Sequence, residues 1–280
     1  MIRFPKLNPI RPPAVAGRFY PGNPTTLSTT IEGFIDRSFV PKPAIGVIVP
    51  HAGYVYSGHV AGAVYSQVAV PPRVIILCPN HTGLGVPLSI MCRGAWQTPL
   101  GNLEIDSELA DALMSANPDL EEDSEAHRRE HAIEVQLPFL QHDRHGPSSD
   151  GSRFVPIAIG TSNWDALERL GKAIAETIQR IDRTTLIVAS SDMNHYESDA
   201  ITRVKDAWAI EPILKLDAKS LHETVRRRSI SMCGAGPAAA MMVASKNLGA
   251  TQSELTKYAT SAEVSKDFDR VVGYAGVIVR

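Results

Sequence analysis

The sequence contains little cysteine, no long hydrophobic run and almost no net charge. Only three of its 280 residues are cysteines, Cys78, Cys92 and Cys233, and they form neither a CxxC motif nor a zinc-finger spacing. A disulfide framework is therefore excluded, and free thiols favour a reducing, cytoplasmic location. Residues 1–13 lack the apolar run of a signal peptide. No stretch approaches the roughly 18 consecutive apolar residues that a membrane span needs.

The charge balance is close to neutral, with a formal net charge of -2. This balance gives no electrostatic basis for binding nucleic acid or an anionic membrane. Hydrophobic residues make up 44% of the chain and charged residues 21%, as is ordinary for a globular protein. A chain of this length buries about three-quarters of its unfolded surface around one core. We therefore expect residues 1–280 to form a single domain.

Short apolar runs alternate with helical patterns along the chain. Continuous apolar runs are typical of strands covered on both faces, and they occur at 44–49, 73–78, 154–159 and 184–190. Residues 271–279 resemble a closing strand, residues 57–68 and 163–181 resemble helices, and residues 142–152 resemble an exposed loop. Strands that alternate with helices indicate βαβ units. The predicted fold is α/β, with a mainly parallel central sheet flanked by helices.

Histidines follow three of the four apolar strands, in the turn directly after each strand. These residues are His51, His81 and His195. In open α/β sheets, ligands bind outside the carboxyl ends of the strands. If the three strands are neighbours, their histidines converge on one cleft. One such histidine is more often a simple turn residue, but three in equivalent positions predict a functional site.

Several ordered motifs together resemble the Memo family. They are Val-Ala-Gly-Arg-Phe-Tyr-Pro at 15–21, Pro-His-Ala-Gly-Tyr at 50–54, Pro-Asn-His at 79–81, His-Ala-Ile-Glu-Val-Gln-Leu-Pro at 131–138, Ser-Ser-Asp-Met-Asn-His at 190–195 and Cys-Gly at 233–234. The resemblance extends from about residue 11 to residue 280. It implies a single Memo-like domain whose fold is similar to that of the LigB-type class III extradiol dioxygenases, which use non-haem iron. It also implies partners: a radical-SAM protein and a small third protein of the AmmeMemoRadiSam system.

The resemblance implies a mononuclear metal site. Its ligands fall on His51, His81 and Cys233. Two imidazoles and a thiolate suit iron or copper, with zinc as an alternative, and suit magnesium or calcium poorly. A thiolate in place of the dioxygenase carboxylate is itself easily oxidised, which weighs against ordinary extradiol cleavage. We expect the helix after Cys233 to lower the pKa of this thiol. After Cys233 this chain has Gly-Ala-Gly-Pro, whereas the animal members of the family have a sequence that resembles Gly-Arg-His-Pro. Any role of that arginine and histidine can therefore not be assigned to this chain.

The matched motifs also imply three candidate catalytic residues, namely His195, Asp192 and His131. His195 resembles the general base of the LigB-type enzymes. Asp192 either orients His195 or joins the metal. His131 is expected to line the pocket, and the charged residues before it indicate that His127 is solvated.

Two functions remain open at the level of sequence. The first is a redox or oxygen-handling metalloenzyme. The second is a non-enzymatic module whose cleft binds a peptide or a partner protein. A deep pocket with an open metal position favours the first function. A hydrophobic, aromatic rim that gives small molecules no access favours the second.

Overall fold

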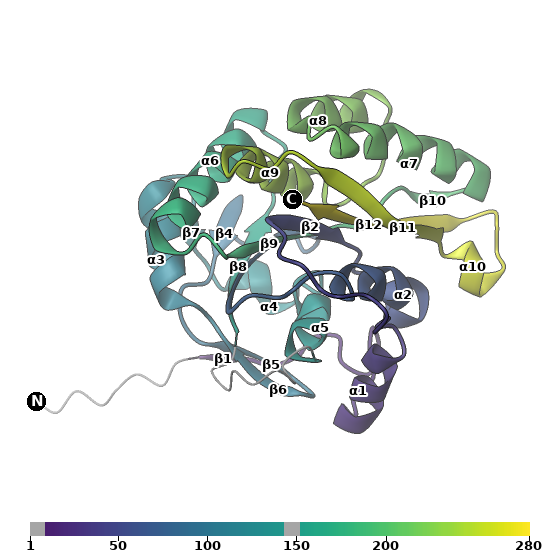
Figure 1. Cartoon of the computed structure of the whole chain (residues 1–280), viewed down its shortest axis with the longest axis horizontal. Coiled ribbons are helices and arrows are strands. Elements are labelled where there is room, and N and C mark those ends of the chain that lie inside the picture. Colours follow the sequence, from purple (N-terminus) through teal and green to yellow (C-terminus); the bar gives the residue numbers. More distant parts are fainter. Residues whose placement is uncertain (1–8, 143–151) are drawn as a thin grey trace, which may run out of the picture.

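A mixed sheet of nine strands forms the centre of the protein. The computed structural model describes residues 9–142 and 152–280 (Figure 1). Nearly all of the loop expected at 142–152 therefore lies outside the described residues. In spatial order the strands are β10 (His195–Glu197), β12 (Val271–Val279), β2 (Gly46–Val49), β9 (Leu186–Ser190), β3 (Arg73–Pro79), β8 (Arg153–Ile159), β4 (Leu88–Ile90) and β7 (Glu121–Glu122), and β11 (Ser253–Thr260) pairs with β12 outside this order.

The four strands predicted from apolar runs form the parallel centre of this sheet. β9 lies between β2 and β3, and β3 also pairs with β8, in parallel in every case. Val49 is in register with Ser190, and Leu77 with Ala189. The strands flanking this centre, β12 and β4, are antiparallel to β2 and β8, respectively. The α/β prediction is confirmed, and the carboxyl ends of β2, β3 and β9 lie at one edge.

Successive residues of the central strands face two separate hydrophobic cores, because side chains alternate across a sheet. In β3, Ile75 and Leu77 join one core, whereas Val74, Ile76 and Cys78 join the other. The first core lies under α3 (Ser107–Ala116), α6 (Trp164–Ile181), α7 (Asp199–Leu214), α8 (Ala218–Arg227) and α9 (Ala235–Asn247).

The second core lies on the opposite face of the sheet (Figure 1). Here the helices are α1 (Pro24–Glu32), α2 (Tyr54–Tyr65), α4 (Glu125–Arg128) and α5 (Leu137–His142), together with the 3-10 turn η1 (Glu134–Gln136) and a small sheet of β1 (Ile10–Arg11), β5 (Ala95–Thr98) and β6 (Gly101–Glu104). The short helix α10 (Ala262–Ser265) precedes β12. Among the described helices, none has the length and apolar character to cross a membrane.

Two helices test the sequence prediction in different ways. The helix expected at 163–181 is confirmed as α6, where the Asn163 side chain caps the first turn by accepting a hydrogen bond from the Ala166 N–H. The helix expected at 57–68 is shifted, since α2 begins at Tyr54 and ends at Tyr65. Its N-cap, Gly53, makes no side-chain hydrogen bond. No capping residue therefore marks this start in the sequence.

A buried carboxylate anchors the N-terminal segment against the second core. The Glu134 side chain is fully buried and forms an ion pair of 2.7 Å with Arg11, which is 4% exposed. Glu134 also accepts hydrogen bonds from the backbone N–H groups of Ala14 and Val15 and from the Tyr20 hydroxyl. All four donors belong to one stretch of ten residues. This carboxylate therefore determines where residues 11–20 lie.

We predict that Glu134→Gln lowers the free energy of unfolding by about 3–5 kcal/mol, because it leaves the buried Arg11 cation without a counter-charge. Urea denaturation followed by circular dichroism measures this change. The matched control is Glu254→Gln, which removes an exposed partner 3.8 Å from Arg280. That change should cost less than about 1 kcal/mol. Equal losses in the two variants would contradict the anchoring role of Glu134.

Candidate metal centre

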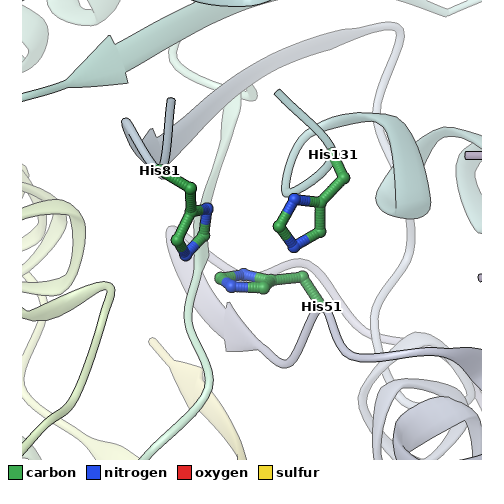
Figure 2. A group of neighbouring side chains, drawn as sticks. All are labelled: His51, His81 and His131. Atoms are coloured by element: carbon green, nitrogen blue, oxygen red, sulfur yellow. The ribbon is translucent and has the colours of Figure 1, made fainter. Parts of the chain in front are cut away.

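Three histidines meet at the edge of the sheet where β2 and β3 end. His51 lies two residues beyond β2, and His81 lies two residues beyond β3. His131 comes from the loop between α4 and η1. Figure 2 shows the three imidazoles turned toward one another. The ring centroids of His51 and His81 are 5.1 Å apart, and one candidate ligand atom from each histidine lies within 4.8 Å of the others. This group could hold a metal ion.

Hydrogen bonds fix the tautomer of His51. The Ser190 hydroxyl donates its proton to the Ala132 carbonyl at 2.7 Å. The same oxygen must therefore accept the hydrogen bond of 3.0 Å that it shares with His51 Nδ1. Gln136 Nε2 donates to it as well, at 2.9 Å. Because the proton of His51 sits on Nδ1, Nε2 keeps a free lone pair.

Glu130 orients the other two histidines. Its Oε1 accepts a hydrogen bond of 2.9 Å from His81 Nδ1 and lies 3.3 Å from His131 Nδ1. The backbone N–H groups of His81 and Ala132 donate to the same carboxylate at 2.6 and 2.9 Å. Although burial acts to raise the pKa of Glu130, these bonds and the histidines lower it to about 2. The carboxylate is therefore ionised and favours Nε2 of both rings as the ligand atom.

Burial keeps most of this cluster uncharged. It lowers the pKa of His51 well below its ordinary value, and the neighbouring His131 and His81 add to the effect. Burial also lowers the pKa of His131, against the opposing charge of Glu130. For His81, burial acts in the same direction, but the hydrogen bond and charge of Glu130 outweigh it and raise the pKa. Neutral imidazole is the form that binds metal ions.

Cys233 lies beside the histidine cluster, in the loop before α9. Its Sγ is 3.2 Å from His51 Nε2. The turn that carries Cys233 lies close to the end of β9, and residue 234 must be glycine for this approach. A Cβ at residue 234 would lie only 2.3 Å from Ser191 Cβ. Burial and the charge of Asp192 raise the pKa of the Cys233 thiol. The expected lowering by the helix is therefore wrong for the metal-free protein, where desolvation outweighs the helix dipole.

Asp192 and His195 reach the same pocket but have different partners. Asp192 Oδ1 accepts hydrogen bonds from the backbone N–H groups of His51 and Ala52, at 2.8 and 3.3 Å. It therefore shapes the turn that carries His51. His195 is held by Ser231, whose carbonyl accepts from Nδ1 at 2.9 Å and whose hydroxyl accepts from the backbone N–H at 2.7 Å. The Nε2 of His195 is left free to accept a proton.

The expectation that His127 is solvated is wrong. His127 is fully buried rather than solvated, with its ring centroid 5.8 Å from that of Trp96, and burial lowers its pKa to about 4. Glu130 is also fully buried. The charged residues Arg128 and Arg129 made this segment resemble an exposed helix end. In the structure α4 is a single turn that points His127 into the second core.

A cavity of about 730 Å³ leads to this cluster. Its inner wall contains Asp192, His195, Cys233 and the three histidines, and its outer wall contains aromatic and charged residues. Cys78 and Cys92 are buried and do not line this cavity. The structure thus brings all six predicted site residues to one cavity and adds Glu130, Ser190 and Ser231 as their partners.

These features define an α/β protein with a histidine cluster at the carboxyl ends of parallel strands. Residues 11–278 match the family model described as Memo-like protein. A MEMO1 family protein of Methanopyrus kandleri is 44% identical, over 96% of this chain and 99% of the relative. MEMO1 family proteins of Methanosarcina barkeri and Pyrobaculum arsenaticum are 42% and 41% identical, each over 96% of this chain and over 100% and 98% of the relatives. The chain therefore belongs to the Memo family.

We predict that Glu130→Gln weakens the binding of Zn²⁺ to the histidine cluster by about 10- to 100-fold, as is typical when the carboxylate partner of a ligating histidine is lost. Competition with a chromogenic chelator measures the affinity. Glu125→Gln is the matched control, because Glu125 is 56% exposed and pairs only at the surface with Arg128. Unchanged affinity in Glu130→Gln would show that this carboxylate does not orient a ligand.

Proposed function

We propose that the protein is a metalloenzyme that binds one transition metal ion through His51, His81 and His131 and transforms a small molecule in the adjoining cavity. The observation that carries this proposal is the convergence of three imidazoles whose ligand atoms lie within 4.8 Å of one another. Nitrogens bound to one ion at about 2.1 Å lie no more than about 4.2 Å apart. Binding one ion at this point therefore requires the rings to move closer together.

The donor set supports iron or copper, with zinc as the alternative. Imidazole suits all three metals. Cys233 Sγ lies 3.2 Å from His51 Nε2, so it is placed to become a fourth ligand once its proton is lost, and a thiolate shifts the preference toward Cu(I). When bound, such an ion would supply Lewis-acid or redox chemistry to a molecule in the adjoining cavity.

His195 is the candidate proton acceptor. Its Nδ1 proton is committed to the Ser231 carbonyl, so Nε2 is the atom that takes a proton from a bound molecule. Burial raises the pKa of Asp192, although the hydrogen bond from the His51 backbone and the charge of His195 act to lower it.

A second candidate function is a non-enzymatic module whose cleft binds a peptide or partner protein, in company with a radical-SAM protein and a small third protein. Tyr56 and Tyr196 favour it, because these aromatic side chains line the cavity and are 39% and 66% exposed. The depth of the cavity argues against this second function, because the cavity extends to the buried His51. Such depth suits a small molecule better than a protein surface.

We predict that His51→Ala, His81→Ala and His131→Ala each lose most of the bound metal, whereas His195→Ala retains nearly all of it. The reason is that the first three rings present their nitrogens to one point, while His195 is held apart by Ser231. Elemental analysis of anaerobically purified protein measures the metal content. Full metal in His131→Ala would leave His51, His81 and Cys233 as the ligand set. Loss in His195→Ala equal to that in His51→Ala would make His195 a ligand.

We further predict that Cys233→Ser weakens Cu(I) binding at least about tenfold and Fe(II) binding by less than about threefold. A serine hydroxyl is hard and stays protonated near neutral pH, whereas the remaining imidazoles still suit Fe(II). Anaerobic competition titrations give both affinities. Cys78→Ala is the control, because this thiol is fully buried in a strand. Equal changes for the two metals would show that the sulfur is not a ligand.

A further inference from the structure

The outer wall of the cavity carries an aromatic residue between a histidine and an arginine. The ring of Tyr196 is 5.5 Å, centroid to centroid, from that of His195. The guanidinium carbon of Arg270 lies 5.7 Å from the centre of the same tyrosine ring. All three residues line the cavity. The Tyr196 ring therefore lies between the proposed base His195 and the cation of Arg270.

Tyr196 adopts a backbone conformation that non-glycine residues rarely adopt. Its φ angle is 63°, and it sits where the pairing of β10 with β12 shifts register. The residue is 66% exposed, so core packing does not explain the conformation. Strained residues of this kind cluster at active sites and ligand clamps. The conformation here places an exposed aromatic ring in the wall of a deep cavity.

The charge of Arg270 is available to a ligand. Some exposed arginines hold carboxylates, as Arg93 holds Asp111 and Arg169 holds Asp119. Over residues 9–142 and 152–280, Arg270 forms no ion pair or side-chain hydrogen bond, and its guanidinium lies over the Tyr196 ring.

The two acidic residues in the cavity wall do not neutralise this cation by direct contact. Asp267 Oδ1 accepts a hydrogen bond from the backbone N–H of Asp269 within its own turn. Asp192 Oδ1 is held by the backbone of His51 and Ala52. A ligand that brings its own negative charge therefore supplies the partner that Arg270 lacks.

We propose that Arg270 and Tyr196 bind the anionic group of the substrate, and that the substrate is a small organic acid whose opposite end reaches the histidine cluster. This inference rests on the proposed function, since it assigns the substrate class of the same site. A cavity of about 730 Å³ is of the size that holds such a molecule. The guanidinium fork suits a carboxylate, and the tyrosine ring covers the body of the ligand.

The test uses linear monohydroxamates of dicarboxylic acids, in chain lengths that cover the cavity, with the whole protein loaded with Zn²⁺. The hydroxamate binds the metal, and the far carboxylate probes the outer wall. Each acid is compared with the matched terminal carboxamide by isothermal titration calorimetry at low and high salt. We expect the acid of at least one length to bind about three- to tenfold more tightly than its amide, with the preference falling at high salt.

Arg270→Gln should abolish this preference without changing the affinity of the amide, and Arg270→Lys should keep part of it. Arg226→Gln, an exposed arginine on α8 outside the cavity, should leave it intact. If no acid binds more tightly than its amide, or if the preference for the acid survives in Arg270→Gln, the assignment of Arg270 and Tyr196 is overturned. The proposed metal site is not affected by either result. If acids and amides alike bind no better to the Zn²⁺-loaded protein than to the metal-free protein, the proposed metal site fails, and this assignment fails with it.

Discussion

Parallel pairing of β2, β9 and β3 is the constraint on which the site depends. Because the backbone hydrogen bonds hold Val49 beside Ser190 and Leu77 beside Ala189, the turns that follow the three strands must share one edge of the sheet. A shift by one residue would reverse the face of every side chain in the strand. The sheet therefore determines the position of His51 relative to His81, independently of any contact between the two rings.

The sheet alone does not orient the rings, and the residues that do so are polar and buried. Ser190 and Glu130 each receive an Nδ1–H, so the ring nitrogens that remain free face the cavity. Ser231 does the same for His195. Each partner is itself held by further hydrogen bonds, as Ser190 is by Ala132 and Gln136. Such support keeps the free ring nitrogens in a fixed geometry, as a metal site requires.

The sequence was sufficient to predict the central strands, the edge at which they end and six of the residues that line the cavity. Continuous apolar runs and the histidines after them carry that information locally. It was not sufficient to identify Glu130, because a carboxylate beside Arg128 and Arg129 has the pattern of a solvated face. Its burial depends on Arg11, whose guanidinium donates to the Glu130 and His127 carbonyls across more than one hundred positions of sequence. No local pattern encodes a contact of that separation.

Burial determines which charge states the residues of the cavity favour. Burial raises the pKa values of Cys233 and Asp192 and lowers that of His51, so in each case it acts against the charged form. A fold selected only for stability would have little reason to gather such costly groups around one point. The metal ion that we propose would offset this cost, because it favours thiolate and carboxylate and requires neutral imidazole. The same reasoning applies at the outer wall, where Arg270 forms no ion pair with any of the described residues. The two proposals thus place opposite charges at the two ends of the cavity: a bound cation at the histidines and a bound anion at the arginine.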